Sequence, residues 1–120
     1  MPRILVVEDE ALVRMGIRHS LEGIGHEVLE ASCAEDALRL LHETERPVQL
    51  LIADLFLPGY SGSELAGQLR GERTEIPSIF ISAHPRDLAV RKGWIAPDAR
   101  LLQKPFANED LVALVGKIIG

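Results

Sequence analysis

Acidic side chains directly follow two apolar segments of this sequence, and they are the residues best suited to chemistry. Glu8, Asp9 and Glu10 follow the first segment, and Asp54 follows the third. Two carboxylates brought together repel by roughly 4 kcal/mol at about 4 Å and an effective dielectric near 20, so the group needs a protonated member or a counter-cation. Carboxylates, a loop carbonyl and a phosphoryl oxygen suit octahedral Mg2+. The pattern therefore indicates a site for phosphoryl chemistry.

Two more polar residues stand at the ends of later apolar segments. Ser82 ends the fourth and Lys104 follows the fifth. Phosphoryl transfer needs a nucleophile, a metal, and a cation and hydroxyl that take up charge on the phosphoryl oxygens, and Asp54 is the candidate nucleophile. Each residue also has a plain structural interpretation. Asp9 or Glu10 could cap the next helix, Lys104 could be a solvated surface lysine, and Ser82 could be a turn hydroxyl.

Alternating strands and helices must position these residues. The predicted strands are Ile4–Val7, Glu27–Glu30, Leu50–Ala53, Ser78–Ser82 and Leu101–Gln103. The first, third and fourth are nearly all aliphatic, as expected of strands buried on both faces, whereas the second has the pattern of an edge strand. We expect a doubly wound (βα)5 α/β fold, a flavodoxin-like three-layer sandwich with parallel sheet order 2-1-3-4-5. Asp9 and Asp54 would then face each other where the strand order reverses.

Helical periodicity fills the intervals between these strands. The predicted helices are Leu12–Ile24, one begun by a capping box at Ser32 and Glu35, one begun by Ser61 and Glu64, a short or mobile Arg86–Lys92, and one after Asn108. The apolar face of the first comprises Val13, Ile17, Leu21 and Ile24. The apolar face of the last comprises Leu111, Leu114, Val115, Ile118 and Ile119.

Composition narrows the class of protein. The length of 120 residues predicts one domain over residues 1–120, with no output domain. The net charge of −5 argues against a general binder of nucleic-acid phosphates. The single cysteine, Cys33, cannot form an internal disulfide. Because no apolar run approaches the roughly 18 residues of a membrane span and no signal peptide is evident, we expect a cytoplasmic protein that binds neither membrane nor nucleic acid directly.

Four short motifs occur in a characteristic order, namely VEDE at 7–10, DLFLP at 54–58, Ser82–Ala83 and Lys104–Phe106. This ordered set resembles the receiver domain of two-component response regulators over essentially the whole chain. Residues 86–100 are similar to receivers attached to hybrid sensor histidine kinases. The resemblance implies a switch, monomeric or weakly dimeric, that takes a phosphoryl group from a sensor histidine kinase or phosphotransfer protein. It would then change its affinity for a downstream protein target and catalyse only its own phosphorylation and slow dephosphorylation.

The resemblance also implies a role for each site residue. The residues expected to bind Mg2+ are Asp9, Asp54, the backbone carbonyl of Phe56 and, through water, Glu8. Those expected at the phosphoryl group are Asp54 as the acceptor, Ser82, Lys104 and, in support, Ala83 and Leu55. The Lys104–Pro105 peptide bond is expected to be cis. Leu101 replaces the aromatic residue of the family's switch position, so activation would rely on Ser82 and loop order.

Several alternatives stay open at this stage. Phe56 and His84 would line the route of attacking water, and we hypothesise that Phe56 slows self-dephosphorylation, unless it merely packs on a neighbouring loop. Trp94 is expected to be buried under the fifth strand, with an exposed partner contact as the alternative. The chain could also be a receiver-like module that is never phosphorylated. A haloacid-dehalogenase-like phosphatase is the least favoured function, because that chemistry wants an Asp where this chain has Phe56.

Overall fold

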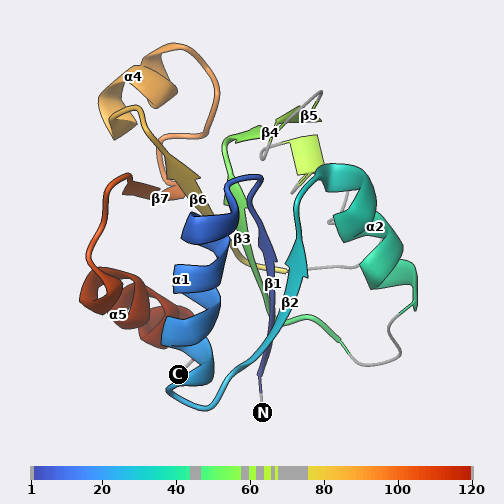
Figure 1. The fold of residues 1–120 in the computed structure, drawn as a ribbon. Helices are drawn as coiled ribbons and strands as arrows, with labels where there is room; N and C mark the ends of the chain where they lie inside the picture. Colours follow the sequence, from blue (N-terminus) through green and yellow to red (C-terminus); the bar gives the residue numbers. More distant parts are fainter. Residues whose placement is uncertain are drawn as a thin grey trace.

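A parallel five-stranded sheet runs through the middle of the molecule (Figure 1). The computed structural model describes residues 2–43, 47–57, 60–61, 64–65, 67 and 76–119. The strands of the sheet are β1 (Arg3–Val7), β2 (Glu27–Ala31), β3 (Leu50–Asp54), β6 (Ser78–Ser82) and β7 (Arg100–Gln103). Their order is β2-β1-β3-β6-β7, with every neighbouring pair parallel. This is the order 2-1-3-4-5 that the sequence predicted, since β4 and β5 form a separate hairpin.

Burial separates the central strands from the edges. Strands β1, β3 and β6 are almost wholly buried, whereas β2 at one edge is mostly half-buried, as its mixed composition predicted. The main difference from the predicted boundaries is at Asp54, which is the last residue of β3 and pairs with Ile81 of β6. The backbone of Asp54 is therefore held by the sheet and not by the loop that follows.

Helices cover both faces of the sheet, which gives the predicted three-layer, flavodoxin-like fold. They are α1 (Ala11–Glu22), α2 (Ala34–Glu43), α4 (Arg86–Arg91) and α5 (Asn108–Ile119). Because side chains alternate along a strand, Ile4 and Val6 face the core under α1 and α5, whereas Leu5 and Val7 face the core under α2 and α4. The apolar face predicted for the last helix packs into the first of these cores.

Two predicted helix boundaries differ from the structure. Ile24 was expected on the apolar face of the first helix, but α1 ends at Glu22 and Ile24 is exposed in the turn that follows. The cause is a tight turn, in which Gly25 adopts a φ of 95°, a conformation that favours glycine. Helix α2 begins at Ala34, one residue later than a cap at Ser32 would place it, because its first turn closes on the carbonyl of Cys33.

A short hairpin directly follows β3 and was not predicted. Strand β4 (Phe56–Leu57) pairs antiparallel with β5 (Tyr60–Ser61). Ser61 therefore lies in a strand instead of beginning a helix. Of the helix predicted there, Glu64, Leu65 and Gly67 are helical, and the remainder lies outside the described residues. The hairpin fixes the backbone immediately after Asp54.

Helix α4 is short, as predicted, with six residues. It is followed by a loop that leads to Trp94 and then to β7. Within the part of the chain that the structure describes, no helix has the length and apolar character needed to cross a membrane.

Candidate functional site

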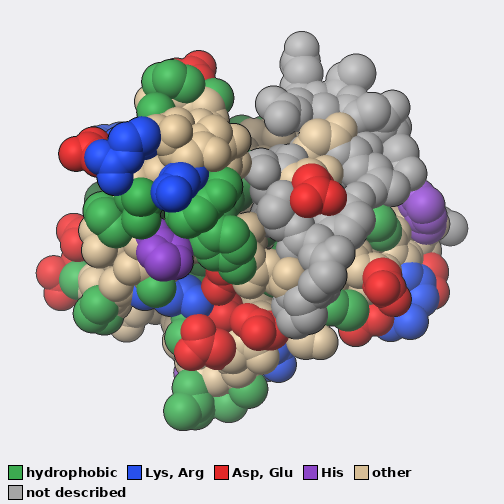
Figure 2. All heavy atoms as spheres, turned by 90° about the horizontal axis from the view of Figure 1, so that it is seen from above, with side chains coloured by type: hydrophobic (Ala, Val, Ile, Leu, Met, Phe, Trp, Pro, Cys, Tyr) green, Lys and Arg blue, Asp and Glu red, His purple; other side chains and the backbone are tan. Residues whose placement is uncertain are grey.

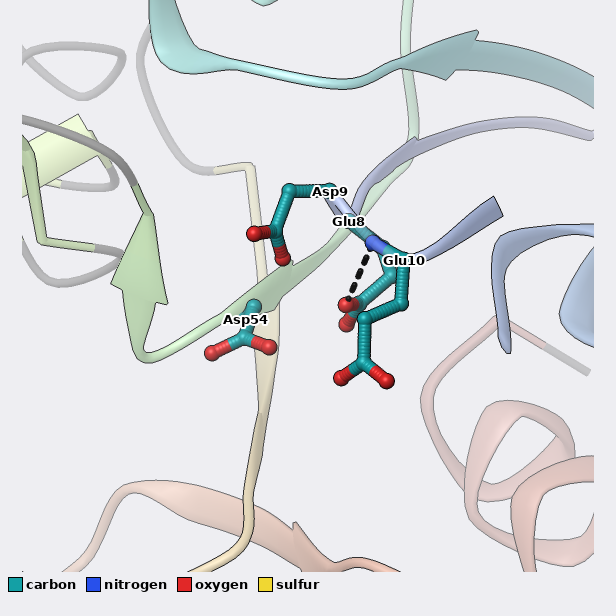
Figure 3. A group of neighbouring side chains, drawn as sticks. All are labelled: Glu8, Asp9, Glu10 and Asp54. Atoms are coloured by element: carbon teal, nitrogen blue, oxygen red, sulfur yellow. Dashed lines mark hydrogen bonds between the residues drawn. The ribbon is translucent and has the colours of Figure 1, made fainter. Parts of the chain in front are cut away.

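Four carboxylates converge at the carboxyl edge of the sheet, and we call Glu8, Asp9, Glu10 and Asp54 the acidic cluster. Glu8 directly follows β1, whose last residue pairs with Ala53 of β3, so the acids of the β1–α1 loop lie next to Asp54. Figure 3 shows the four side chains turned toward one another. One oxygen from each lies within 4.8 Å of the others. The sheet thus brings together Asp9 and Asp54, which the sequence predicted to face each other.

Lys104 supplies the cation of this site. Its Nζ donates to Oδ2 of Asp54 at 2.7 Å, to Oε1 of Glu10 at 2.9 Å and to Oε1 of Glu8 at 3.2 Å. The side chain is only 16% exposed, so the interpretation as a solvated surface lysine is wrong. These hydrogen bonds outweigh the effect of burial and raise the pKa of Lys104. The peptide bond between Lys104 and Pro105 is cis.

Glu8 is the fully buried member of the acidic cluster. Its Oε1 also accepts from the Glu10 amide at 3.1 Å. Its Oε2 lies 3.1 Å from Lys104 Nζ but has no hydrogen-bond partner of suitable geometry among the described residues. Burial, together with the neighbouring Asp54 carboxylate, raises the pKa of Glu8 to about 7. The site therefore holds excess negative charge that one lysine does not neutralise.

The acidic cluster fits a hard divalent cation. Two ligands of one Mg2+ lie at most about 4.2 Å apart, because each sits about 2.1 Å from the ion. Ligand oxygens already within 4.8 Å of one another need only small side-chain movements to meet that requirement. Glu8 Oε2, which has the ion pair with Lys104 but no hydrogen bond among the described residues, is a buried oxygen of the kind that a cation or its bound water would satisfy.

Glu10 was among the acids that follow the first apolar segment, but no role in the site was predicted for it. The sequence left open that Asp9 or Glu10 caps the first helix, and Glu10 is the N-cap residue of α1. However, its side chain makes no capping hydrogen bond and reaches Lys104 instead, so capping by the Glu10 carboxylate is wrong. The run of three acids at 8–10 could have predicted its place in the site, because the third acid still lies at the same edge of the sheet as the first two.

Both carboxylate oxygens of Asp54 are held in place. Oδ1 accepts from the amide of Phe56 at 2.8 Å, and Oδ2 accepts from Lys104. The observed contact of Phe56 with Asp54 runs through its amide, and metal binding by its carbonyl stays a prediction. Leu55 has its side chain in the core and donates its amide to the Ile81 carbonyl at 2.8 Å. Its predicted support of a phosphoryl group would therefore need a contact other than these.

Ser82 lies at the same edge and is turned toward its own loop. It is buried at the end of β6, and its Oγ accepts from the His84 amide at 2.9 Å. This is the turn-hydroxyl arrangement, from which a contact with a phosphoryl group would require rotation of the side chain. The next residue, Ala83, is exposed. Leu101 of β7 lies beside Phe80 and is half-buried against the core under α2 and α4.

Three rings pack beside the acidic cluster, and we call Phe56, His84 and Trp94 the aromatic cluster. The ring centroids of Phe56 lie 4.7 Å from Trp94 and 5.6 Å from His84, and those of His84 and Trp94 are 5.4 Å apart. Figure 2, which looks onto this edge from above, shows acidic side chains gathered next to hydrophobic side chains and a histidine. Trp94 is half-buried against the core, so it lies between the two predicted alternatives of full burial and free exposure.

Comparison with known proteins agrees with this geometry. The sequence profile of the response regulator receiver domain matches residues 4–116. The sensor kinase CckA of Brucella abortus is 32% identical over 118 residues, which cover 97% of this chain and 12% of CckA. The transcriptional regulatory protein YrkP of Bacillus subtilis is 34% identical over 113 residues, which cover 94% of this chain and 47% of YrkP. The chain thus spans half or less of the length of these two relatives.

A solved receiver domain has the same fold. The receiver domain of the hybrid histidine kinase CckA superposes with a TM-score of 0.81 at 33% identity, covering 98% of this chain and 99% of that one. Receiver domains of two-component systems are phosphorylatable signalling switches and not enzymes of the ordinary kind. Sheet order, acidic edge and sequence profile agree, and this chain belongs to the response regulator receiver domain family.

Proposed function

We propose that this domain accepts a phosphoryl group on Asp54 from a phosphohistidine of a sensor histidine kinase or phosphotransfer protein. The reaction depends on Mg2+, and phosphorylation changes the affinity of the domain for a downstream protein. The observation that carries the proposal is the setting of Asp54, a nearly buried carboxylate beside three other acids with Lys104 Nζ at 2.7 Å. A carboxylate so placed has a metal site and a cation within reach of any phosphoryl group it takes up.

In the proposed reaction, a carboxylate oxygen of Asp54 attacks the phosphorus atom. The new P–O bond forms as the P–N bond to the imidazole breaks, and the electron pair of that bond returns to the imidazole nitrogen. Lys104 already binds Oδ2 of Asp54 and would stabilise charge on the phosphoryl oxygens. The Phe56 amide holds the other carboxylate oxygen and so orients the nucleophile.

Mg2+ bound at the acidic cluster would neutralise the carboxylates and the incoming phosphoryl oxygens. We propose Asp9, Asp54 and the Phe56 carbonyl as its protein ligands, with Glu8 acting through a water molecule. Glu8 suits an indirect role because it is fully buried and already accepts from the Glu10 amide.

The response to phosphorylation is proposed to begin at Ser82. Its hydroxyl would leave the His84 amide and turn to the phosphoryl group, with Ala83 and Leu55 alongside as supporting residues. Leu101 is aliphatic and half-buried, which is why we propose that loop order, instead of an aromatic side chain in that position, carries the change to the partner surface.

Incubation with Mg2+ and acetyl phosphate tests the proposal directly. Intact-mass measurement should show the gain of one phosphoryl group, absent in EDTA and absent in Asp54→Asn. The matched control is Asp36→Asn, which removes an acid of α2 that pairs with Arg39 and should leave labelling unchanged. No mass gain in the wild-type domain would favour an interaction module that is never phosphorylated. Turnover of a phosphate monoester that is lost in Asp54→Asn would favour a phosphatase.

A further inference from the structure

We propose that Arg14 is a positioning residue of the metal site, which holds the loop that carries Asp9. The inference rests on the proposed function, because it concerns how Asp9 is presented to Mg2+. Arg14 lies in α1 and is not a member of the acidic cluster. Its guanidinium NH1 donates to the backbone carbonyl of Glu8 at 2.7 Å.

Asp9 depends on its two neighbours for its position. Among the residues that the structure describes, it makes no hydrogen bond or ion pair of its own, and its side chain is exposed. Arg14 binds the carbonyls of both neighbours of Asp9. Its guanidinium donates to the carbonyl of Glu8, and its backbone amide donates to the carbonyl of Glu10 at 3.0 Å. Arg14 thus fixes the Glu8–Asp9 peptide group through its guanidinium and the Glu10–Ala11 peptide group through its amide.

Strand β2 holds Arg14 in turn. The Nε atom of Arg14 lies 3.3 Å from Oε1 of Glu30 in β2. The next residue of this strand, Ala31, accepts a hydrogen bond from the amide of Glu8 at 3.0 Å through its carbonyl. Two consecutive residues of β2 therefore anchor the loop, one through the guanidinium of Arg14 and one through the backbone. A guanidinium suits this task because its fork of donors binds two acceptors in fixed directions.

The contact of Arg14 with Glu8 has the features of a strong hydrogen bond. It is short and charge-assisted, and both partners are shielded from water, since the Arg14 side chain is only 21% exposed. Residues that orient metal ligands without touching the metal typically contribute 10-fold to 100-fold to metal affinity. Loss of the Arg14 contact should therefore weaken metal binding without removing any ligand.

Arg18 provides a matched control within the same helix. Its NH1 pairs with Oε2 of the same Glu30 at 2.8 Å, and it also pairs with Glu22. It has no contact with the Glu8–Glu10 loop among the described residues. Arg14→Gln and Arg18→Gln therefore both lose an ion pair to Glu30, but only the first loses the hydrogen bond to the loop.

Calorimetric titration with Mg2+ alone, without phosphodonor, tests the inference. The dissociation constant should rise about 10-fold in Arg14→Gln, less than about 2-fold in Arg18→Gln, and by an intermediate factor in Glu30→Gln. Thermal melting in EDTA checks that all three variants are folded. If Arg14→Gln does not fold, Glu30→Gln decides, since it replaces the charged acceptor of the Arg14 guanidinium by a neutral one and keeps the charge of Arg14.

The rate of phosphorylation by acetyl phosphate supplies a second readout. At Mg2+ concentrations well above its own dissociation constant, Arg14→Gln should return to near the wild-type rate, because a positioning residue acts only through metal affinity. Equal Mg2+ affinities in Arg14→Gln and Arg18→Gln, or an unchanged affinity in Glu30→Gln, would overturn the inference alone. No Mg2+ binding by the wild-type domain would overturn the proposed function as well.

Discussion

Two neighbouring parts of one sheet edge are held together by different forces. The acidic cluster and Lys104 are joined by charge, through hydrogen bonds of 2.7 to 3.2 Å between groups up to 96 residues apart in the chain. In the described part of the chain, the three residues of the aromatic cluster contact one another only through their rings, and Phe56 is 45% exposed. Such ring pairs contribute about 0.5 to 1.5 kcal/mol each beyond the area that they bury.

Two backbone hydrogen bonds connect these parts. The Phe56 amide donates to Asp54, and the His84 amide donates to Ser82. The side chains of Asp54 and Ser82 are thus each bound to the backbone of an aromatic residue. The comparison suggests that changes in the charged part alter the free energy of unfolding strongly, whereas changes in the rings mainly alter access to Asp54.

The largest effect is expected from Lys104→Met, which leaves the acidic cluster without its cation. The free energy of unfolding at pH 8 in EDTA should fall by about 3 to 4 kcal/mol, because a buried carboxylate loses its partner. Urea denaturation measures this, and Mg2+ should restore much of the loss. Lys92→Met is the control, since Lys92 is exposed and makes no ion pair among the described residues. An unchanged stability at pH 8 would contradict the role of charge in this part.

Glu8→Gln should change the free energy of unfolding at pH 8 in the opposite direction and stabilise the domain. The pKa of Glu8 is raised to about 7, so the folded protein binds that proton more tightly than the unfolded chain does. Without Mg2+, the contribution of Glu8 to stability is therefore most favourable below pH 4.5, falls as the pH rises to about 7, and then levels off. At pH 8 the variant should be more stable than the wild type by about 2 to 3 kcal/mol.

Urea denaturation of wild type and variant between pH 4 and 8 in EDTA measures this difference. The control is Glu109→Gln, which changes an exposed acid at the start of α5. Its free energy of unfolding should follow the wild-type pH dependence. A wild-type curve parallel to that of Glu8→Gln over the whole range would show that folding does not raise the pKa of Glu8.

The charged part of the edge was largely predictable from the sequence. Asp54, Asp9 and Lys104 each stand at the end of a predicted strand, and parallel strands deliver their carboxyl ends to one edge whatever the loops do. The aliphatic runs that define those strands also predicted that the first, third and fourth are buried, and the doubly wound fold class predicted the sheet order. The contact of Glu10 with Lys104 was not predicted because the usual role of an acid just before a helix is capping, and only the fold shows that Lys104 lies within its reach.

The aromatic part could not be predicted in the same way. Phe56, His84 and Trp94 come from a hairpin and two loops, and no spacing in the sequence relates them. Their contacts depend on loop conformations that weak packing forces select. The β4–β5 hairpin was missed for the same reason, because two-residue strands leave no recognisable periodicity.

Phe56→Asn tests whether the aromatic cluster controls access to Asp54. The Phe56 amide binds Oδ1 of Asp54 and the ring packs on His84 and Trp94, so we expect the ring to lie across one approach of water. The variant should shorten the lifetime of phospho-Asp54 about 5-fold, which corresponds to about 1 kcal/mol in the barrier. Intact mass after removal of acetyl phosphate follows the decay. In the control Phe56→Leu, an apolar side chain is kept, so phospho-Asp54 should decay nearly as in the wild type. An unchanged lifetime in Phe56→Asn would show that Phe56 has only a packing role.

The smallest effect is expected from removal of one ring of the aromatic cluster. Trp94 is the single tryptophan, so its fluorescence reports the packing of these rings. Phe56→Ala removes the ring whose centroid lies 4.7 Å from that of Trp94, so quenching of Trp94 fluorescence by acrylamide should rise measurably. The free energy of unfolding should fall by less than about 1 kcal/mol, since Phe56 is already 45% exposed. Leu12→Ala is the control, because Leu12 is more exposed still and belongs to neither cluster. A loss of stability as large as that of Lys104→Met would mean that the aromatic cluster is part of the core, and the contrast between the two parts of the edge would fail.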